Sequence, residues 1–134
     1  MTTENRWRLP ALKTTPAAAR AAVVDFCAAS GIEARAVNDL VLCVSEAVTN
    51  VVVRAQDHRG ADETVDVSAA YADGRLRIEV RGADDVWPRV DPSGVVLGLP
   101  IISALTRSVQ CSLNAAGGTN FVMTFDAGPS SLKD

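Results

Sequence analysis

A carboxylate and a carboxamide stand four residues apart in the largely apolar stretch from Asp39 to Ala55, as Glu46 and Asn50. If this stretch is a helix, residues four apart lie one above the other on a single face. Such oxygen ligands suit Mg²⁺, which prefers oxygen donors and keeps several of its waters. The pair therefore predicts a floor for a metal ion or a polar ligand, or else simply the solvated side of an amphipathic helix.

The apolar periodicity around this pair predicts a helix from about Arg35 to Gln56. The β-branched residues near Thr49 would also suit a buried strand, but the periodic region is too long for one ordinary strand. A core-facing stripe recurs at spacings of three and four. A polar stripe follows the same spacings through Asp39, Cys43, Glu46, Asn50 and Arg54.

Composition sets the class of protein. The chain has 134 residues, of which 48% are hydrophobic, so we expect one globular domain with a sizeable core. The net charge of −3 argues against nonspecific binding to nucleic acid. We find no apolar run that would span a membrane and no signal-peptide core in residues 1–12, so we expect a cytoplasmic protein. Three widely spaced cysteines are expected to be small buried residues in a reducing compartment: Cys27, Cys43 and Cys111.

The N-terminal part predicts a strand and a helix. Arg6–Leu12 alternates weakly and predicts an edge strand, where Pro10 is tolerated. A helix should follow, with Thr15 as its N-cap and Pro16 at its first position. Gly31 is expected to end it.

The C-terminal half predicts two hairpins. Thr64–Tyr71 and Arg75–Arg81 alternate cleanly around Asp73-Gly74, a strong hairpin turn. Val109–Leu113 and Asn120–Phe125 form the second pair. The predicted fold class is α+β: a two-layer α/β sandwich with a mainly antiparallel mixed sheet and helices on one face.

Between the hairpins, residues 82–97 are irregular, which in a compact domain is typical of a functional connection. Gly98–Arg107 predicts a short helix with Pro100 in its first turn. We expect a single domain at 1–127 and a disordered tail at 128–134.

With this order in place, the chain resembles a known family. Ser45–Asn50 resembles the N-box of the GHKL ATPases, in the version found in bacterial anti-sigma-factor serine kinases of the RsbW type. Gly98-Leu99 resembles the second glycine box. Gly117–Thr119 resembles the final Gly-Gly-Thr hairpin. The resemblance covers about Pro16 to Phe125 and implies a Bergerat-like ATPase fold.

The resemblance implies roles for the helix residues. Asn50 would bind Mg²⁺ through its side-chain oxygen, and Glu46 would orient or deprotonate the attacking hydroxyl. Arg54, one turn further on, would meet a phosphate or be solvated. Catalysis would be phosphoryl transfer from ATP to a serine.

The resemblance also implies roles for the glycine boxes. Gly98 and Leu99 would offer the amides of a helix N-terminus to phosphate oxygens. Thr119, following Gly118, would donate a hydrogen bond near the adenine or through a water.

Two positions depart from the family pattern. Gly82 stands where the family has an Asp that accepts a hydrogen bond from the adenine amino group. Asp84 and Asp85 would fill that role if the backbone is shifted, or else belong to an acidic solvent loop. Val96 replaces the first glycine of the family's Gly-x-Gly and would crowd the phosphates.

Three functions follow from the resemblance. The first is an anti-sigma regulatory factor that binds ATP, Mg²⁺ and a sigma factor, and phosphorylates a serine on a STAS-type anti-sigma antagonist. The second is a catalytically inactive binding module of the same fold. The third is a nucleotide-binding domain detached from a histidine kinase, which the absence of a phosphoacceptor-histidine helix in this chain disfavours. Family members commonly dimerise, so the resemblance also implies a homodimer.

Overall fold

The computed structural model describes residues 3–32, 34–58, 63–82, 108–113 and 119–126. Within them the chain forms five strands and two helices. In chain order these are β1 (Thr3–Pro10), α1 (Thr15–Ala29), α2 (Ala34–His58), β2 (Thr64–Ala72), β3 (Arg75–Gly82), β4 (Ser108–Leu113) and β5 (Thr119–Asp126).

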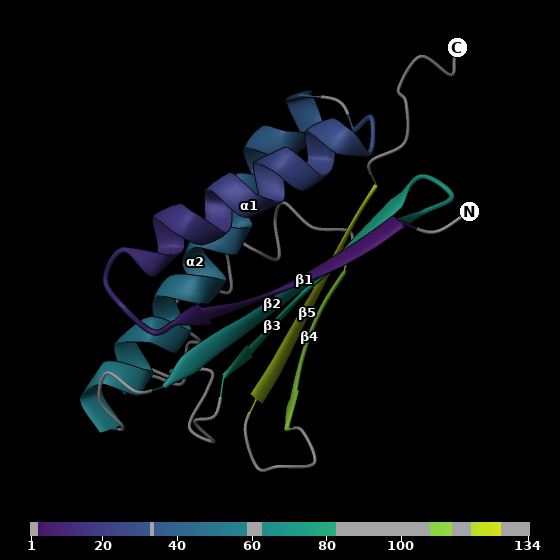
Figure 1. Ribbon diagram of the computed structural model, residues 1–134. Coiled ribbons are helices and arrows are strands. Elements are labelled where there is room, and N and C mark those ends of the chain that lie inside the picture. The colour runs from purple at the N-terminus through teal and green to yellow at the C-terminus, as the bar shows by residue number, and fades with distance from the viewer. Residues whose placement is uncertain (1–2, 33, 59–62, 83–107, 114–118, 127–134) are drawn as a thin grey trace.

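The strands form one sheet in the order β1-β2-β3-β5-β4, with β1 and β4 at its edges (Figure 1). All four pairings between the described strands are antiparallel. The predicted α+β sandwich and the edge position of the first strand are therefore confirmed. That strand covers Thr3–Pro10 rather than Arg6–Leu12.

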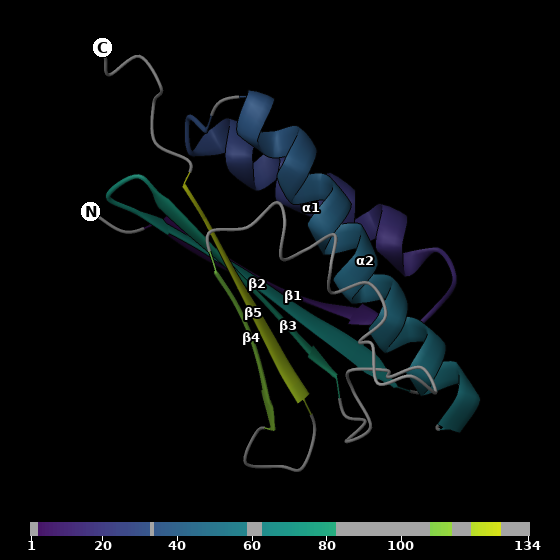
Figure 2. The ribbon, with the colours of Figure 1, turned by 180° about the vertical axis from the view of Figure 1, so that it is seen from behind.

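Both helices lie side by side along one face of the sheet, as Figures 1 and 2 show from opposite sides. Strand residues that point toward the helices alternate with polar ones, as the period of two requires. Helix α2 buries its apolar stripe against them because every third or fourth residue faces the sheet. The largest fully buried side chains of this core are Phe121, Leu40, Leu76, Ile78, Met123, Val23, Val44, Val48, Val65, Val67 and Val80.

A buried hydroxyl joins β1 to α1. Thr15 Oγ1 accepts a hydrogen bond from the Leu12 N–H at 3.0 Å and donates one to the Pro10 carbonyl. The predicted N-cap is therefore off by one residue, because the cap is Thr14, whose side chain makes no capping hydrogen bond. The Thr15 hydroxyl instead satisfies backbone groups of the connection before the helix.

Two glycines take the left-handed conformation that their turns demand. Gly31 follows the C-cap of α1 with a φ of 76°, as predicted. Asp73 and Gly74 have φ values of 53° and 77°, which are the signs of a type I′ hairpin turn between β2 and β3. The predicted hairpin is confirmed.

Several predicted segments lie outside the described residues. These are the irregular connection beyond residue 82, the short helix at 98–107, the turn at 114–118 and the tail at 128–134. The predictions for Asp84, Asp85, Val96, Gly98, Leu99 and Gly118 fall there. Within the described part of the chain, neither helix is long and apolar enough to cross a membrane.

Candidate functional site

Helix α2 holds Glu46 and Asn50 at the border between core and solvent. Ala47, Val48 and Val51, their neighbours in sequence, are at most 6% exposed and pack in the core. This anchoring fixes the rotation of the helix about its axis. Glu46 and Asn50 are consequently both half-buried, with their side chains one turn apart.

A hydrogen bond orients the Asn50 amide. Its Nδ2 donates to the Glu46 main-chain carbonyl at 2.8 Å, four residues earlier. The side-chain oxygen of Asn50 has no partner among the described residues, and neither has the Glu46 carboxylate. As far as the described residues go, the helix therefore presents one carboxylate and one amide oxygen that no other side chain or backbone group binds, which is the donor set predicted from the spacing.

Cys43 lies beside this pair and is fully buried. Burial, followed by the negative charges of Asp39 and Glu46, raises the pKa of its thiol to about 11. The thiol is therefore protonated at neutral pH, and it adds no anionic ligand to the stripe on which Glu46 lies.

Ser45 links the two helices next to Glu46. Arg20 on α1 donates from Nη1 to Ser45 Oγ at 2.8 Å. Hydrogen bonds from a charged donor are among the stronger ones. This bond fixes α1 against α2 one residue away from the candidate base, so Ser45 serves the packing of the helices.

The end of β3 meets α2 directly beyond Asn50. A Cβ atom at Gly82 would lie 2.8 Å from Val51 Cγ1. In the sheet, Gly82 is paired with Thr119, the first residue of β5. The fold thus brings Asn50, Gly82 and Thr119 to one end of the molecule, although 32 and 37 residues separate them in sequence.

Only some of the other predicted site residues lie among the residues that the structure describes. Arg54 lies in α2, one turn after Asn50. Asp84, Asp85, Gly98, Leu99 and Gly118 lie outside the described residues, so their roles stay predictions. No cluster of three or more His, Cys, Asp or Glu side chains suited to a metal occurs among the residues that the structure describes.

The comparison with protein families decides the class. Residues 9–125 match the model of the histidine kinase-like ATPase domain. The chain belongs to this family. A histidine kinase-like ATPase domain implies nucleotide binding, typically with Mg²⁺, and the two-layer fold agrees with that membership. A search of the curated proteins gives no match.

Solved structures share the fold of this histidine kinase-like ATPase domain. The RsbU and RsbW domains of Rv1364c from Mycobacterium tuberculosis match with a TM-score of 0.74 and 24% identity, over 93% of this chain and 32% of that chain. This chain thus spans about a third of that protein chain. The SiaB-SiaC complex from Pseudomonas aeruginosa matches with a TM-score of 0.65 and 13% identity, over 90% of this chain and 87% of that chain.

The polar groups of the site fit the Mg²⁺ of Mg·ATP but not its adenine. Glu46 and Asn50 offer oxygen atoms that have no partner in the part of the chain that the structure describes, and oxygen donors suit Mg²⁺ and its retained waters. Gly82 offers no side-chain acceptor for an adenine amino group, and Val51 fills the space that a side chain there would need. Helix α2 therefore carries two oxygen donors of the kind that Mg²⁺ takes, whereas the end of β3 carries no side-chain acceptor at Gly82.

Two features of the site were missed by reasoning from sequence. The contact between Gly82 and Val51 joins residues on different elements, and no local pattern signals it. The hydrogen bond from Arg20 to Ser45 likewise depends on the register of α1 against α2. The one sign of this bond in the sequence was that each helix has a polar residue, Arg20 or Ser45, near the face expected to meet the other helix.

Proposed function

We propose that the chain is an anti-sigma regulatory factor that binds Mg·ATP and a sigma factor, and that phosphorylates a serine on a STAS-type antagonist. The observation that carries this proposal is the pair of side-chain oxygens at Glu46 and Asn50, which no other described residue binds. The hydrogen bond from the Asn50 amide to the α2 backbone orients this pair. The fold shared with the RsbU and RsbW domains and with SiaB-SiaC supports the partner-switching class.

Each residue of the pair has a distinct role in this reaction. Asn50 would hold Mg²⁺ through its Oδ1, and the metal would neutralise charge on the phosphates. Glu46 would accept the proton of the serine hydroxyl as that oxygen attacks the γ-phosphorus and the bond to ADP breaks. A half-buried carboxylate suits this role because it is accessible to the incoming hydroxyl.

A second function is a binding module that holds a sigma factor or an antagonist without nucleotide chemistry. The observation that favours it is the contact of Gly82 with Val51, which replaces the family's adenine acceptor by packed apolar atoms. Under both functions we propose a cytoplasmic homodimer of a single domain at 1–127.

Calorimetric titration with ATP and Mg²⁺ separates the two functions. The first predicts binding to the wild type and its loss in Asn50→Ala. Asn38→Ala is a matched control, because Asn38 lies exposed on the same helix, three turns away. A ligand at a hundred times its Kd should also stabilise the fold by about 2.7 kcal/mol. If millimolar nucleotide does not bind, the kinase function is wrong and the binding module is the function that remains.

Transfer is tested with labelled ATP and a purified STAS-type antagonist. Glu46→Gln should keep nucleotide binding and abolish labelling of the antagonist, because the amide cannot accept the proton. If Glu46→Gln labels the antagonist at the wild-type rate, Glu46 is not the catalytic base.

Co-purification with the sigma factor encoded nearest to the gene tests whether the chain sequesters that sigma factor. Light scattering tests the homodimer, and a monomer at micromolar concentration would contradict it.

A further inference from the structure

The face of the sheet that points away from the helices carries a hollow of about 360 Å³. It lies over the three strands at one edge of the sheet. Its lining includes side chains from all three: Arg6 and Arg8 on β1, Asp66 and Ser68 on β2, and Arg81 on β3. None of them lies on α2, so the hollow is separate from the Glu46 and Asn50 pair.

The register of the strands explains the hollow. Ser68 is paired with Arg6 on one side and with Glu79 on the other. Asp66 is similarly paired with Arg8 and Arg81. Short side chains on the middle strand thus stand between long ones on its neighbours, and directly opposed residues on one face are close enough to interact. The result is a trough with a polar floor and walls that bear guanidinium groups.

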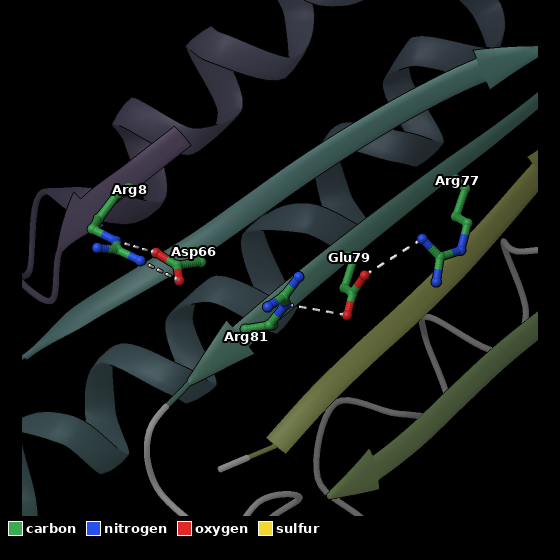
Figure 3. A network of polar contacts seen from close by, with 5 residues as sticks. All are labelled: Arg8, Asp66, Arg77, Glu79 and Arg81. Atoms are coloured by element: carbon green, nitrogen blue, oxygen red, sulfur yellow. Dashed lines mark hydrogen bonds and ion pairs between the residues drawn. The ribbon is translucent and has the colours of Figure 1, made fainter. Parts of the chain in front are cut away.

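Two carboxylates of the protein already show what these walls bind (Figure 3). Asp66 accepts from Arg8 Nε at 2.9 Å and from Arg8 Nη2 at 3.4 Å. Glu79, only 8% exposed, has one oxygen 3.3 Å from Arg81 Nε and the other 3.4 Å from Arg77 Nη1. Both carboxylates hold wall arginines in place, which limits the entropy lost when a further anion binds.

Arg6 differs from the other two wall arginines. Its side chain is exposed and has no carboxylate partner among the described residues. Its main-chain N–H donates to Asn5 Oδ1 at 2.9 Å, so this edge group is already occupied by a side chain rather than open to an added strand. The Arg6 guanidinium, exposed and with no carboxylate bound to it from residues 3–32, 34–58, 63–82, 108–113 or 119–126, is therefore the group that an outside anion would meet first.

We propose that this hollow is a docking site for an acidic segment of a partner protein, with a Glu or Asp carboxylate bound by Arg6. Guanidinium groups match carboxylates in planar, two-point geometry. The nearby charges of Asp66 and Glu79 favour a single negative charge over a phosphate dianion, because each added charge meets their repulsion. The site lies opposite the helical layer, so such a segment can bind while Glu46 and Asn50 are occupied.

Fluorescence anisotropy with a labelled hexaglutamate peptide and the full chain tests this site. Arg6→Ala should weaken binding at least fivefold, and Ser68→Leu should weaken it by filling the floor without changing the charge. Arg75→Ala is the matched control. It removes one positive charge from the same face, where Arg75 pairs with Asp126 beyond the hollow, and it should change affinity less than twofold. Thermal melts verify that all variants fold.

Three results would overturn the proposal. The first is no binding at millimolar peptide. The second is equal weakening by Arg6→Ala and Arg75→Ala, which would show a general charge effect. The third is displacement of the peptide by inorganic phosphate at equal concentration, which would make this a phosphate site. Asn50→Ala should leave peptide binding unchanged, so failure of the nucleotide site and failure of this one are distinguishable.

Discussion

Gly82 and Val51 approach each other so closely that a Cβ atom on Gly82 would lie 2.8 Å from Val51 Cγ1. Real Cβ atoms do not make such contacts. Val51 is 6% exposed and, as a β-branched residue in a helix, is held close to one rotamer. The end of β3 and the middle of α2 are therefore packed together through the absence of a side chain.

Substitution of Gly82 should reveal this packing. We expect Gly82→Ala to lower the free energy of unfolding by about 1–3 kcal/mol, as overpacking of a core does. Adding Val51→Ala should relieve the clash, so the double variant should be more stable than the sum of the single effects predicts. Adding Val48→Ala, one turn earlier, is the control and should be additive. Urea unfolding of the wild type, the three single variants and the two double variants measures these effects. Additivity in both pairs would contradict the contact.

The same contact should limit nucleotide affinity. We expect the double variant Val51→Ala/Gly82→Asp to bind ATP more tightly than the wild type, because it supplies a carboxylate acceptor and the room for it. Gly82→Asp without the second change should show no gain, since Val51 occupies the space. Calorimetry measures both. An equal gain from Gly82→Asp on its own would show that space is not the obstacle.

The Thr15 hydroxyl should contribute to stability. Thr15→Val keeps the shape but removes a donor and an acceptor, so the Leu12 N–H and the Pro10 carbonyl keep only the hydrogen bond that joins them to each other. We expect the free energy of unfolding to fall by about 1–3 kcal/mol. Thr14→Val is the control, because its exposed side chain makes no capping bond and should change stability little. If Thr14→Val and Thr15→Val lower stability equally, the loss comes from the lower helix propensity of Val and not from the hydrogen bonds of Thr15.

Alkaline pH should destabilise the fold through two thiols. Burial raises the pKa of Cys27 and Cys43 from 9.0 to about 11. Between these values the unfolded thiols lose their protons while the folded ones keep them, so the free energy of unfolding falls as pH rises. Well below pH 9 both thiols stay protonated in the folded and the unfolded state, so neither makes the free energy of unfolding depend on pH.

Urea unfolding of the wild type and of Cys27→Ala/Cys43→Ala at pH 8, 9, 10 and 11 measures this effect. The wild type should lose up to about 3 kcal/mol more per thiol over this range, the equivalent of a two-unit shift. Both proteins lose the same amount from other titrating groups. Parallel curves would mean that the thiols ionise equally in both states.

Local patterns predicted the elements well because their causes are local. The Asp73-Gly74 turn needs residues that tolerate positive φ, and the alternation of β2 and β3 follows from one buried face. Glu46 and Asn50 were predictable because four residues make one helical turn. The contact between Gly82 and Val51 could not be predicted, because it depends on the position of α2 along β3.

The open face of the sheet shows a second limit of sequence patterns. Glu79 alternates along β3 with the core residues Ile78 and Val80, and it points away from the helices. Even so, it is only 8% exposed, with Arg77 and Arg81 of its own strand on either side. Period-two patterns tell which face a residue takes, whereas its burial depends on the lengths of its neighbours across the strands.

The edge position of β1 has a consequence for synthesis. Arg8 bonds Asp66, which follows 58 residues later, after both helices. At roughly 5–20 residues per second, β1 leaves the ribosome roughly 3–12 s before its partner. During that interval its hydrogen-bonding groups have no strand to pair with. The alternating charges of Glu4, Arg6 and Arg8 then protect the nascent chain, because a charged strand is a poor template for aggregation.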